Sequence, residues 1–116
     1  MKTVNFYKTS EGKSPVAEFL DSLTAKEAQK VIWVLKLVEE MDRVPATYLK
    51  KLTNTEEIWE IRVQAGNNIF RLLGFFDGDN LIVLNHGFQK KTQKTPARDI
   101  KIAEQRRRDY LQRRSQ

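Results

Sequence analysis

The sequence predicts an α+β domain with a twisted antiparallel sheet, an N-terminal αα-hairpin and a C-terminal helix, in the order β-α-α-β-β-β-α. Three observations support this class. Two helix-start signals precede apolar residues at helical spacing in the first third of the chain. Three runs of strand-forming residues follow, separated by short segments rich in Gly, Asn and Asp. A Thr-Pro pair then opens a last helical segment, and residues 1–116 have the usual size of one domain.

The N-terminal third predicts one strand and two helices. Residues 4–9 are typical of a short strand. Ser14 followed by Pro15 predicts the start of a helix that ends just before Thr24. Thr24 and Glu27 have the spacing of a capping box, which predicts the start of a second helix. We expect one apolar stripe of this helix to pack inward, namely Ala28, Val31, Ile32, Leu35, Val38 and Met41.

The rest of the chain predicts a three-stranded meander and a last helix. After a connector over residues 47–57, the strands cover residues 58–64, 69–76 and 81–88. The segments between them have the composition of four-residue turns. Thr95 and Pro96 are expected to cap the last helix, on which Ile100, Ala103, Arg107 and Tyr110 share a face. We expect the helices to lie on one face of the sheet.

The charge of the chain is concentrated near its C-terminus. Residues 1–85 contain 11 Lys or Arg against 12 Asp or Glu, whereas residues 86–116 contain 10 against 3, so the last quarter carries the whole excess of the net +6. A concentrated basic surface favours a polyanion, because each neutralised phosphate releases counterions. The alternative is a solvated basic helix without a partner.

Several classes of protein and site are disfavoured by composition. The chain has no cysteine and one histidine, and its carboxylates lack metal-site spacing, so we expect no disulfide, no metal and no cofactor. The first residues lack a signal-peptide pattern, and no apolar run reaches membrane-spanning length. The expected location is therefore the cytoplasm, without a membrane partner.

Strand register predicts a row of three functional side chains. If residues 65–68 and 77–80 are both four-residue turns, Arg62 stands opposite Arg71, and Arg71 stands opposite His86. Opposed arginines repel each other, so such a row requires an anionic partner. The same repulsion predicts that loss of Arg71 costs little stability. The alternative is that both arginines are ordinary solvent-facing residues and that His86 is structural.

Lysines lie close to this row in the predicted sheet. Such a cluster suits phosphodiester chemistry on RNA: arginine grips phosphate oxygens, lysine stabilises developing negative charge, and histidine exchanges a proton near neutral pH. RNA supplies its own nucleophile, the 2′-hydroxyl, so the protein needs an acid and a base rather than a metal. Glu60 is the nearest carboxylate on the same face. The lysines near the row are Lys90, Lys91 and Lys94 after the last strand. The basic pair Lys50 and Lys51 in the connector is a further candidate for phosphate binding.

Three segments carry a resemblance to a known family. Residues 58–62 read IWEIR, residues 69–73 read IFRLL, and residues 82–96 read IVLNHGFQKKTQKTP. This pattern resembles the phage-derived, HigB-like branch of the RelE/ParE superfamily of type II toxin–antitoxin toxins. Those chains carry a W/Y-E-I/L-R strand, an arginine-led hydrophobic strand and an H-G-F-x-K-K-T-Q-K-T-P stretch. The resemblance covers essentially the whole domain and implies a RelE-like fold.

The resemblance also implies an activity and its residues. RelE- and HigB-like members enter the ribosomal A site, cleave mRNA without a metal and are neutralised by a cognate antitoxin. Their catalytic arginine and basic residues match Arg71 and Lys90 or Lys91 here, and Arg62 is a phosphate contact. Some members use a tyrosine near the start of the last helix as general base. This chain has none there, so His86 is the expected substitute.

Two other functions remain open at this level. ParE-like members of the same superfamily inhibit DNA gyrase without enzymatic activity. A phage-derived RNA-binding module without catalysis would carry the same basic residues. The basic cluster around a histidine that could transfer a proton favours the nuclease over the gyrase inhibitor, and a growth-arrest assay would separate all three.

Overall fold

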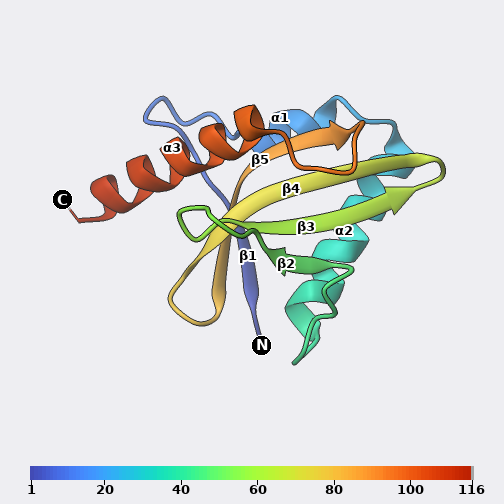
Figure 1. Cartoon of the computed structure of the whole chain (residues 1–116), viewed down its shortest axis with the longest axis horizontal. Helices are drawn as coiled ribbons and strands as arrows, with labels where there is room; N and C mark the ends of the chain where they lie inside the picture. The colour runs from blue at the N-terminus through green and yellow to red at the C-terminus, as the bar shows by residue number, and fades with distance from the viewer. Residues whose placement is uncertain (116) are drawn as a thin grey trace.

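The computed structural model describes residues 1–115 and contains three helices and five strands in that range. Figure 1 shows how they are arranged. The expected order of elements is confirmed, with one additional strand, β2. Along the chain the elements are β1 (Thr3–Phe6), α1 (Pro15–Asp21), α2 (Ala25–Glu40), β2 (Leu49–Lys51), β3 (Trp59–Ala65), β4 (Asn68–Asp77), β5 (Leu81–Lys90) and α3 (Ala97–Arg114).

The additional strand lies in the segment for which the sequence predicts only a connector. Leu49 is buried and stands opposite Ile61 of β3. A strand of three residues is too short to show an alternating pattern, so only its pairing with β3 reveals it. This pairing places Lys50 and Lys51 on opposite faces of the sheet, because side chains alternate along a strand.

The sheet is mixed, which corrects the expectation of an antiparallel sheet. Its strand order is β1-β5-β4-β3-β2. The pairs β2 with β3, β3 with β4 and β4 with β5 are antiparallel. In contrast, β1 runs parallel to β5, with Thr3 opposite Leu81 and Phe6 opposite Leu84. Between β1 and β5 the chain forms the helical hairpin and the strands β2, β3 and β4. The partner of β1 is therefore set by long-range packing that a local pattern does not contain.

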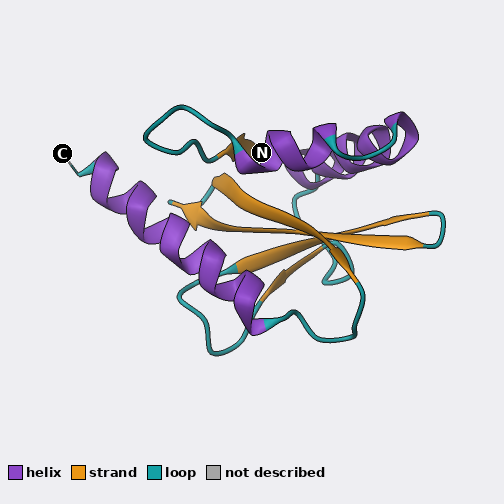
Figure 2. Ribbon diagram, turned by 90° about the horizontal axis from the view of Figure 1, so that it is seen from above, coloured by secondary structure: helices purple, strands orange, loops and turns teal. Residues whose placement is uncertain are grey.

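The helices cover both faces of the sheet, so the expectation of a single covered face is wrong. Figure 2 shows α1 and α2 on one side and α3 on the other. On β4, Phe70 and Leu72 pack toward α2, whereas Leu73 and Phe75 belong to clusters that contain residues of α3. A strand buried on both faces has a continuous apolar run instead of an alternating one. The run FRLLGFF on β4 carries that signal.

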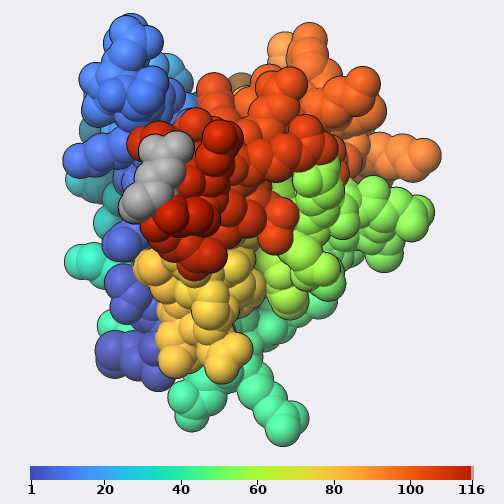
Figure 3. Space-filling view, turned by 90° about the vertical axis from the view of Figure 1, so that its left-hand side faces the viewer, coloured from blue at the N-terminus to red at the C-terminus, as the bar shows by residue number. Residues whose placement is uncertain are grey.

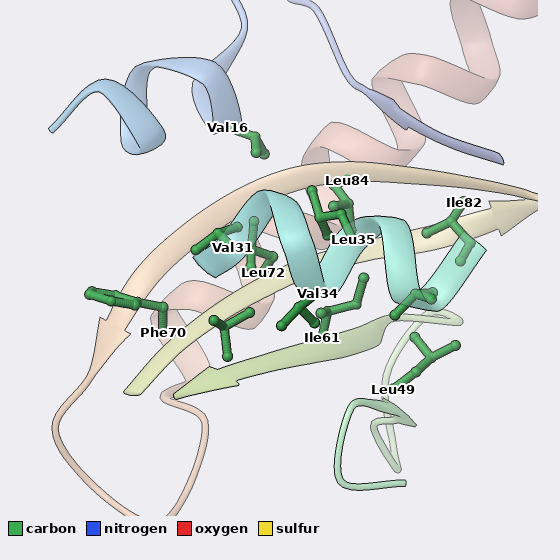
Figure 4. Packing of buried hydrophobic residues seen from close by; sticks show 12 residues of the cluster. Val16, Val31, Val34, Leu35, Leu49, Ile61, Phe70, Leu72, Ile82 and Leu84 are labelled. Atoms are coloured by element: carbon green, nitrogen blue, oxygen red, sulfur yellow. The ribbon is translucent and has the colours of Figure 1, made fainter. Parts of the chain in front are cut away.

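The larger core lies between α2 and the sheet, as Figure 4 shows. Of the predicted stripe of α2, Val31, Leu35 and Val38 are buried, and Ala28 and Met41 are partly buried. Ile32 is an exception, because its side chain is 39% exposed, and Val34 is buried beside the stripe instead. The stripe is therefore rotated slightly from the predicted position.

The helix starts follow the predicted signals at α1 and α2 but not at α3. Ser14 accepts a hydrogen bond from the Ala17 amide at 3.2 Å. Thr24 and Glu27 form the reciprocal capping box, at 3.2 and 3.0 Å. Pro96 is the N-cap of α3 without a side-chain cap, and the Thr95 hydroxyl donates instead to Glu60. The predicted cap at Thr95 thus has a different partner.

Two further features concern the described residues as a whole. Within residues 1–115, no helix combines the length and apolar character needed to span a bilayer. In the same range, no three His, Cys, Asp or Glu side chains are grouped so that they could hold a metal ion.

Candidate functional site

The two arginines predicted to face each other do so. Arg62 of β3 stands opposite Arg71 of β4, as the predicted register requires. The turn between these strands is tighter than expected, since Ala65 already pairs with Asn68, but the register is unchanged. On β4, Arg71 shares a face with Leu73 and Phe75, which pack toward α3. Arg62, opposite Arg71, lies on the same face.

The third member of the predicted row is not opposite Arg71. Phe88 occupies that place, and His86 stands opposite Leu73, two positions along β5. Two local features cause the difference. The β4–β5 turn closes at Asp77 and Leu81, one residue tighter than expected, and a β-bulge near Gly74 adds one more residue to β5.

The bulge decides which side chains of β5 face the arginines. Before it, Ile82 and Leu84 point toward α2 and Val83 toward α3. An extra residue reverses the alternation, so that Phe88 and Lys90 join the face that carries Arg71. Without the bulge, the last part of β5 would present Lys90 to the opposite face.

His86 lies under α3 instead of beside the arginines. Its Nε2 is 2.7 Å from Asp99 Oδ1, and Arg106 Nη1 is 3.4 Å from its Nδ1. Arginine can only donate, so Nδ1 acts as acceptor and Nε2 carries the proton toward Asp99. Burial lowers the pKa of His86, opposed by Asp99 and reinforced by Arg106 and Arg98. This geometry joins β5 to α3.

A cleft of about 860 Å³ opens between β2–β4 and the loop that leads into α3. Five basic side chains and one carboxylate are among the residues that line it. A second hollow of about 370 Å³ shares Arg62, Arg71, Lys90 and Gln93 with the cleft and adds Lys91. We call these two hollows together the basic cleft. The six predicted residues that it brings together are Lys50, Arg62, Arg71, Lys90, Lys91 and Lys94.

Two of the predicted site residues lie elsewhere. Lys51 faces away from Lys50, opposite Trp59, and its ammonium forms an ion pair with Glu57 at 2.8 Å. His86 does not line the basic cleft. Face alternation in a strand that the pattern did not reveal explains the first case, and the tighter β4–β5 turn together with the bulge explains the second.

Arg71 is held by a buried carboxylate. Its Nη1 donates to Glu60 Oε1, and the Thr95 hydroxyl donates to Glu60 Oε2. Arg71 is 8% exposed and Glu60 3%. Burial lowers the pKa of Arg71, Glu60 opposes this effect, and Arg62 adds to it. The guanidinium is thus fixed at the wall of the cleft, and its Nε has no hydrogen-bond partner among the described residues.

The surroundings of Lys90 in the basic cleft lower the pKa of its ammonium group. Burial lowers its pKa, and the neighbouring charges of Arg71, Arg62 and Lys50 act in the same direction, against Glu60. A lysine among like charges gives up its proton more readily than an isolated one. The lowered pKa makes Lys90 a candidate for proton transfer as well as for charge stabilisation.

Sequence reasoning missed several polar residues of the cleft. Thr95 was expected to cap α3, and Gln93 was not singled out, yet both line the cleft. Asn54 also lines it, with a backbone φ of 58° in the left-handed region. Asn adopts that region more readily than most residues, so the asparagine in the 52–58 loop is a local sequence signal for a turn there. Figure 3 shows this loop, in green, against α3, and Arg108 of α3 bonds to Glu56 there.

Comparison with known proteins gives one family. Residues 18–108 match the sequence model of the family described as phage derived protein Gp49-like (DUF891). This range contains strands β2 to β5 and all the residues that line the basic cleft. No curated protein gives a significant match to the chain.

Proposed function

Because the chain belongs to the phage-derived Gp49-like family, a toxin-like family of toxin–antitoxin modules, we propose that it is a ribosome-dependent mRNA endonuclease of the RelE/HigB type. Membership in that family implies an antitoxin partner. The proposed substrate is mRNA in the ribosomal A site, and the proposed place of action is the cytoplasm. The observation that carries the proposal is the basic cleft around Arg71.

The charge of the cleft supports a phosphodiester substrate. Five basic side chains surround a single carboxylate, and that carboxylate is already bonded to Arg71 and Thr95. The uncompensated charge is suited to a polyanion that enters from solvent. A guanidinium fixed in place binds two phosphate oxygens at little further cost in side-chain entropy.

The proposed reaction uses the 2′-hydroxyl of RNA as nucleophile. A bond forms between O2′ and phosphorus, the bond from phosphorus to O5′ breaks, and the products are a 2′,3′-cyclic phosphate and a 5′-hydroxyl. A base takes the proton of the 2′-hydroxyl and an acid supplies one to O5′. Arg71 and Arg62 are proposed to stabilise the charge on the phosphorane, with Lys91 and Lys94 near the leaving oxygen.

Lys90 takes the proton-transfer role in this proposal, and His86 does not. The pKa of Lys90 is lowered by burial and by Arg71, which increases its neutral fraction near physiological pH. His86 uses one ring nitrogen toward Asp99 and the other toward Arg106. We assign His86 to holding α3, whose first turn forms one wall of the cleft through Ala97 and Ile100.

The test is inducible expression in a bacterial host, followed by mapping of mRNA 5′ ends and of DNA breaks. Growth arrest with new 5′ ends inside translated codons is the expected result, and Lys90→Ala should remove them. Arrest with double-strand DNA breaks and intact mRNA would establish gyrase inhibition instead. Absence of arrest in a strain without the antitoxin would contradict the toxin role altogether.

A further inference from the structure

The basic cleft continues around the edge of the sheet. It shares Thr47 and Arg62 with a hollow of about 290 Å³. That hollow shares Lys30 and Gln64 with another, of about 380 Å³, at the first turns of α2. Because neighbouring hollows have lining residues in common, they form one groove. We call the part beyond Arg62 the α2 groove.

The α2 groove exists because β2 is short. Its three residues pair with Trp59, Glu60 and Ile61 only. The second half of β3, Val63 to Ala65, therefore has no strand on its outer side in the described part of the chain. The helix α2 lies next to this open edge, as Figure 1 indicates.

The α2 groove is basic like the cleft. Lys26 and Lys30 line it, and neither forms an ion pair within residues 1–115. The one carboxylate of this part, Glu27, accepts hydrogen bonds from the Thr24 amide and from Asn68 Nδ2. The Glu27 carboxylate is therefore already bonded to the N-cap of α2 and to the β3–β4 turn.

An exposed tryptophan lies beside Lys30, a lining residue of the groove. Trp33 is 53% exposed, and Lys30 Nζ lies 4.8 Å from its ring centroid. Only Ile32 and Met1 are further large hydrophobic residues that are exposed among those described. A cation on an accessible indole face marks a surface on which a nucleobase can stack.

We propose that the α2 groove binds single-stranded RNA that extends from the basic cleft, with phosphates near Arg62, Lys30 and Lys26 and a base on Trp33. The inference rests on the proposed function, in which RNA occupies the cleft. Continuity with the cleft and the same sign of charge favour RNA over a protein partner. The exposed apolar surface of Ile32 and Trp33 is also small for a docked amphipathic helix, which needs several anchors in a row.

The test compares two non-cleavable 2′-O-methyl RNAs, of about four and about twelve nucleotides, within the range that small single-strand-binding surfaces cover. Binding to the full chain is measured by fluorescence anisotropy at several salt concentrations. We expect the longer RNA to bind more tightly. Trp33→Ala should weaken its binding about fivefold or more, Trp33→Phe should retain most of the affinity, and the short RNA should bind all three proteins equally.

The charge contribution is measured in the same assay. Lys30→Gln should reduce the slope of log affinity against log salt by about 0.7 for the longer RNA. Lys13→Gln is the matched control, because Lys13 is exposed in the loop before α1 and lines none of these hollows. The control should bind both RNAs as the unchanged protein does.

Each contrary outcome has a distinct meaning. Equal affinity for both RNAs, or unchanged binding by the Trp33 and Lys30 variants, overturns the α2 groove and leaves the cleft intact. Failure of both RNAs to bind overturns the α2 groove as a site for free RNA, whereas the proposed function is decided separately by the mapping of mRNA ends in cells. Variants that bind RNA normally but lose the antitoxin would identify the α2 groove as a protein interface and overturn the RNA assignment.

Discussion

Glu60 and Arg71 form an ion pair in which both side chains are almost fully buried, at the wall of a basic cleft. The pair links residues on adjacent strands of one sheet face. The Thr95 hydroxyl holds the second carboxylate oxygen and so joins the pair to the loop before α3. The arginine that we propose as catalytic therefore also has a structural role.

This pair changes what a substitution at Arg71 should do. Repulsion between Arg62 and Arg71 alone predicts that Arg71→Ala costs little stability. In the structure, the substitution leaves the buried Glu60 without its cation, which typically costs about 3–5 kcal/mol. We expect Arg71→Ala to lose cleavage and to show a clearly lower midpoint in urea unfolding.

A second variant separates the two effects. Glu60→Gln combined with Arg71→Gln removes both charges and should recover most of the stability. Activity should remain lower by about two to three orders of magnitude, because the phosphate contact is still missing. A stable double variant with full toxicity would show that Arg71 has no role in the chemistry.

Adjacent lysines provide a matched pair for the cleft. Lys50 lines it, whereas Lys51 faces the other side of the sheet and pairs with Glu57. Lys50→Ala should weaken RNA binding and lower the salt slope by about 0.7. Lys51→Ala should change neither, and its effect on stability should stay below about 1 kcal/mol because the ion pair is exposed. Equal effects of the two variants on RNA binding would contradict the proposal that RNA binds in the basic cleft.

Gly74 permits the bulge that places Lys90. A Cβ at this position would lie 2.1 Å from the Val83 carbonyl oxygen and 2.8 Å from Leu84 Cα. Both are backbone atoms of β5, so they cannot move aside as a side chain does. Gly74→Ala should cost roughly 3 kcal/mol or more and reduce activity in the fraction that folds. Thermal unfolding and RNA binding on the same sample measure both.

Gly87→Ala is the control for that substitution. A Cβ there would meet the ring of Phe19 at 2.5 Å, and a side chain can shift or be shortened. Phe19→Leu should therefore recover much of the stability lost by Gly87→Ala. Recovery of Gly74→Ala by any similar side-chain change would argue against a backbone clash.

The single histidine predicts a specific pH dependence. Burial lowers the pKa of His86 below its ordinary value of 6.5, while Asp99 opposes this shift and Arg106 and Arg98 reinforce it. Above about pH 6.5 both folded and unfolded states are neutral at this residue, and its contribution is complete. As pH falls below that value, the unfolded chain takes up the proton first, so stability is lost until the folded pKa is passed.

Urea unfolding at pH 7.5 and 5.5 measures this contribution. His86→Gln should be less stable than the unchanged protein at the higher pH and should lose less stability on acidification. RNA binding at pH 7.5 should be reduced only slightly, because His86 holds α3 and does not line the cleft. A cleavage rate that falls to the background with His86→Gln while the fold is kept would restore this residue as a catalytic candidate.

Local signals in the sequence were sufficient to predict most of the helices and strands. Ser14, Thr24 and Glu27 satisfy backbone groups within a few residues of themselves, so their helix starts could be read directly. The Arg62–Arg71 pairing follows from one short turn, and the expected register was correct although the turn is tighter. The lysines at the end of β5 and just after it, Lys90, Lys91 and Lys94, likewise predicted part of the basic cleft.

What the tertiary structure decided involves contacts between distant segments. The parallel pairing of β1, the two-sided covering of the sheet and the short strand β2 depend on which surfaces meet after the chain folds. The tighter β4–β5 turn and the bulge near Gly74 together move His86 away from Arg71, and the bulge brings Lys90 to the face of the arginines. Side-chain alternation reverses with one added residue. The basic residues of the candidate site could therefore be predicted from the sequence, whereas their geometry depended on the tight β4–β5 turn and the bulge near Gly74.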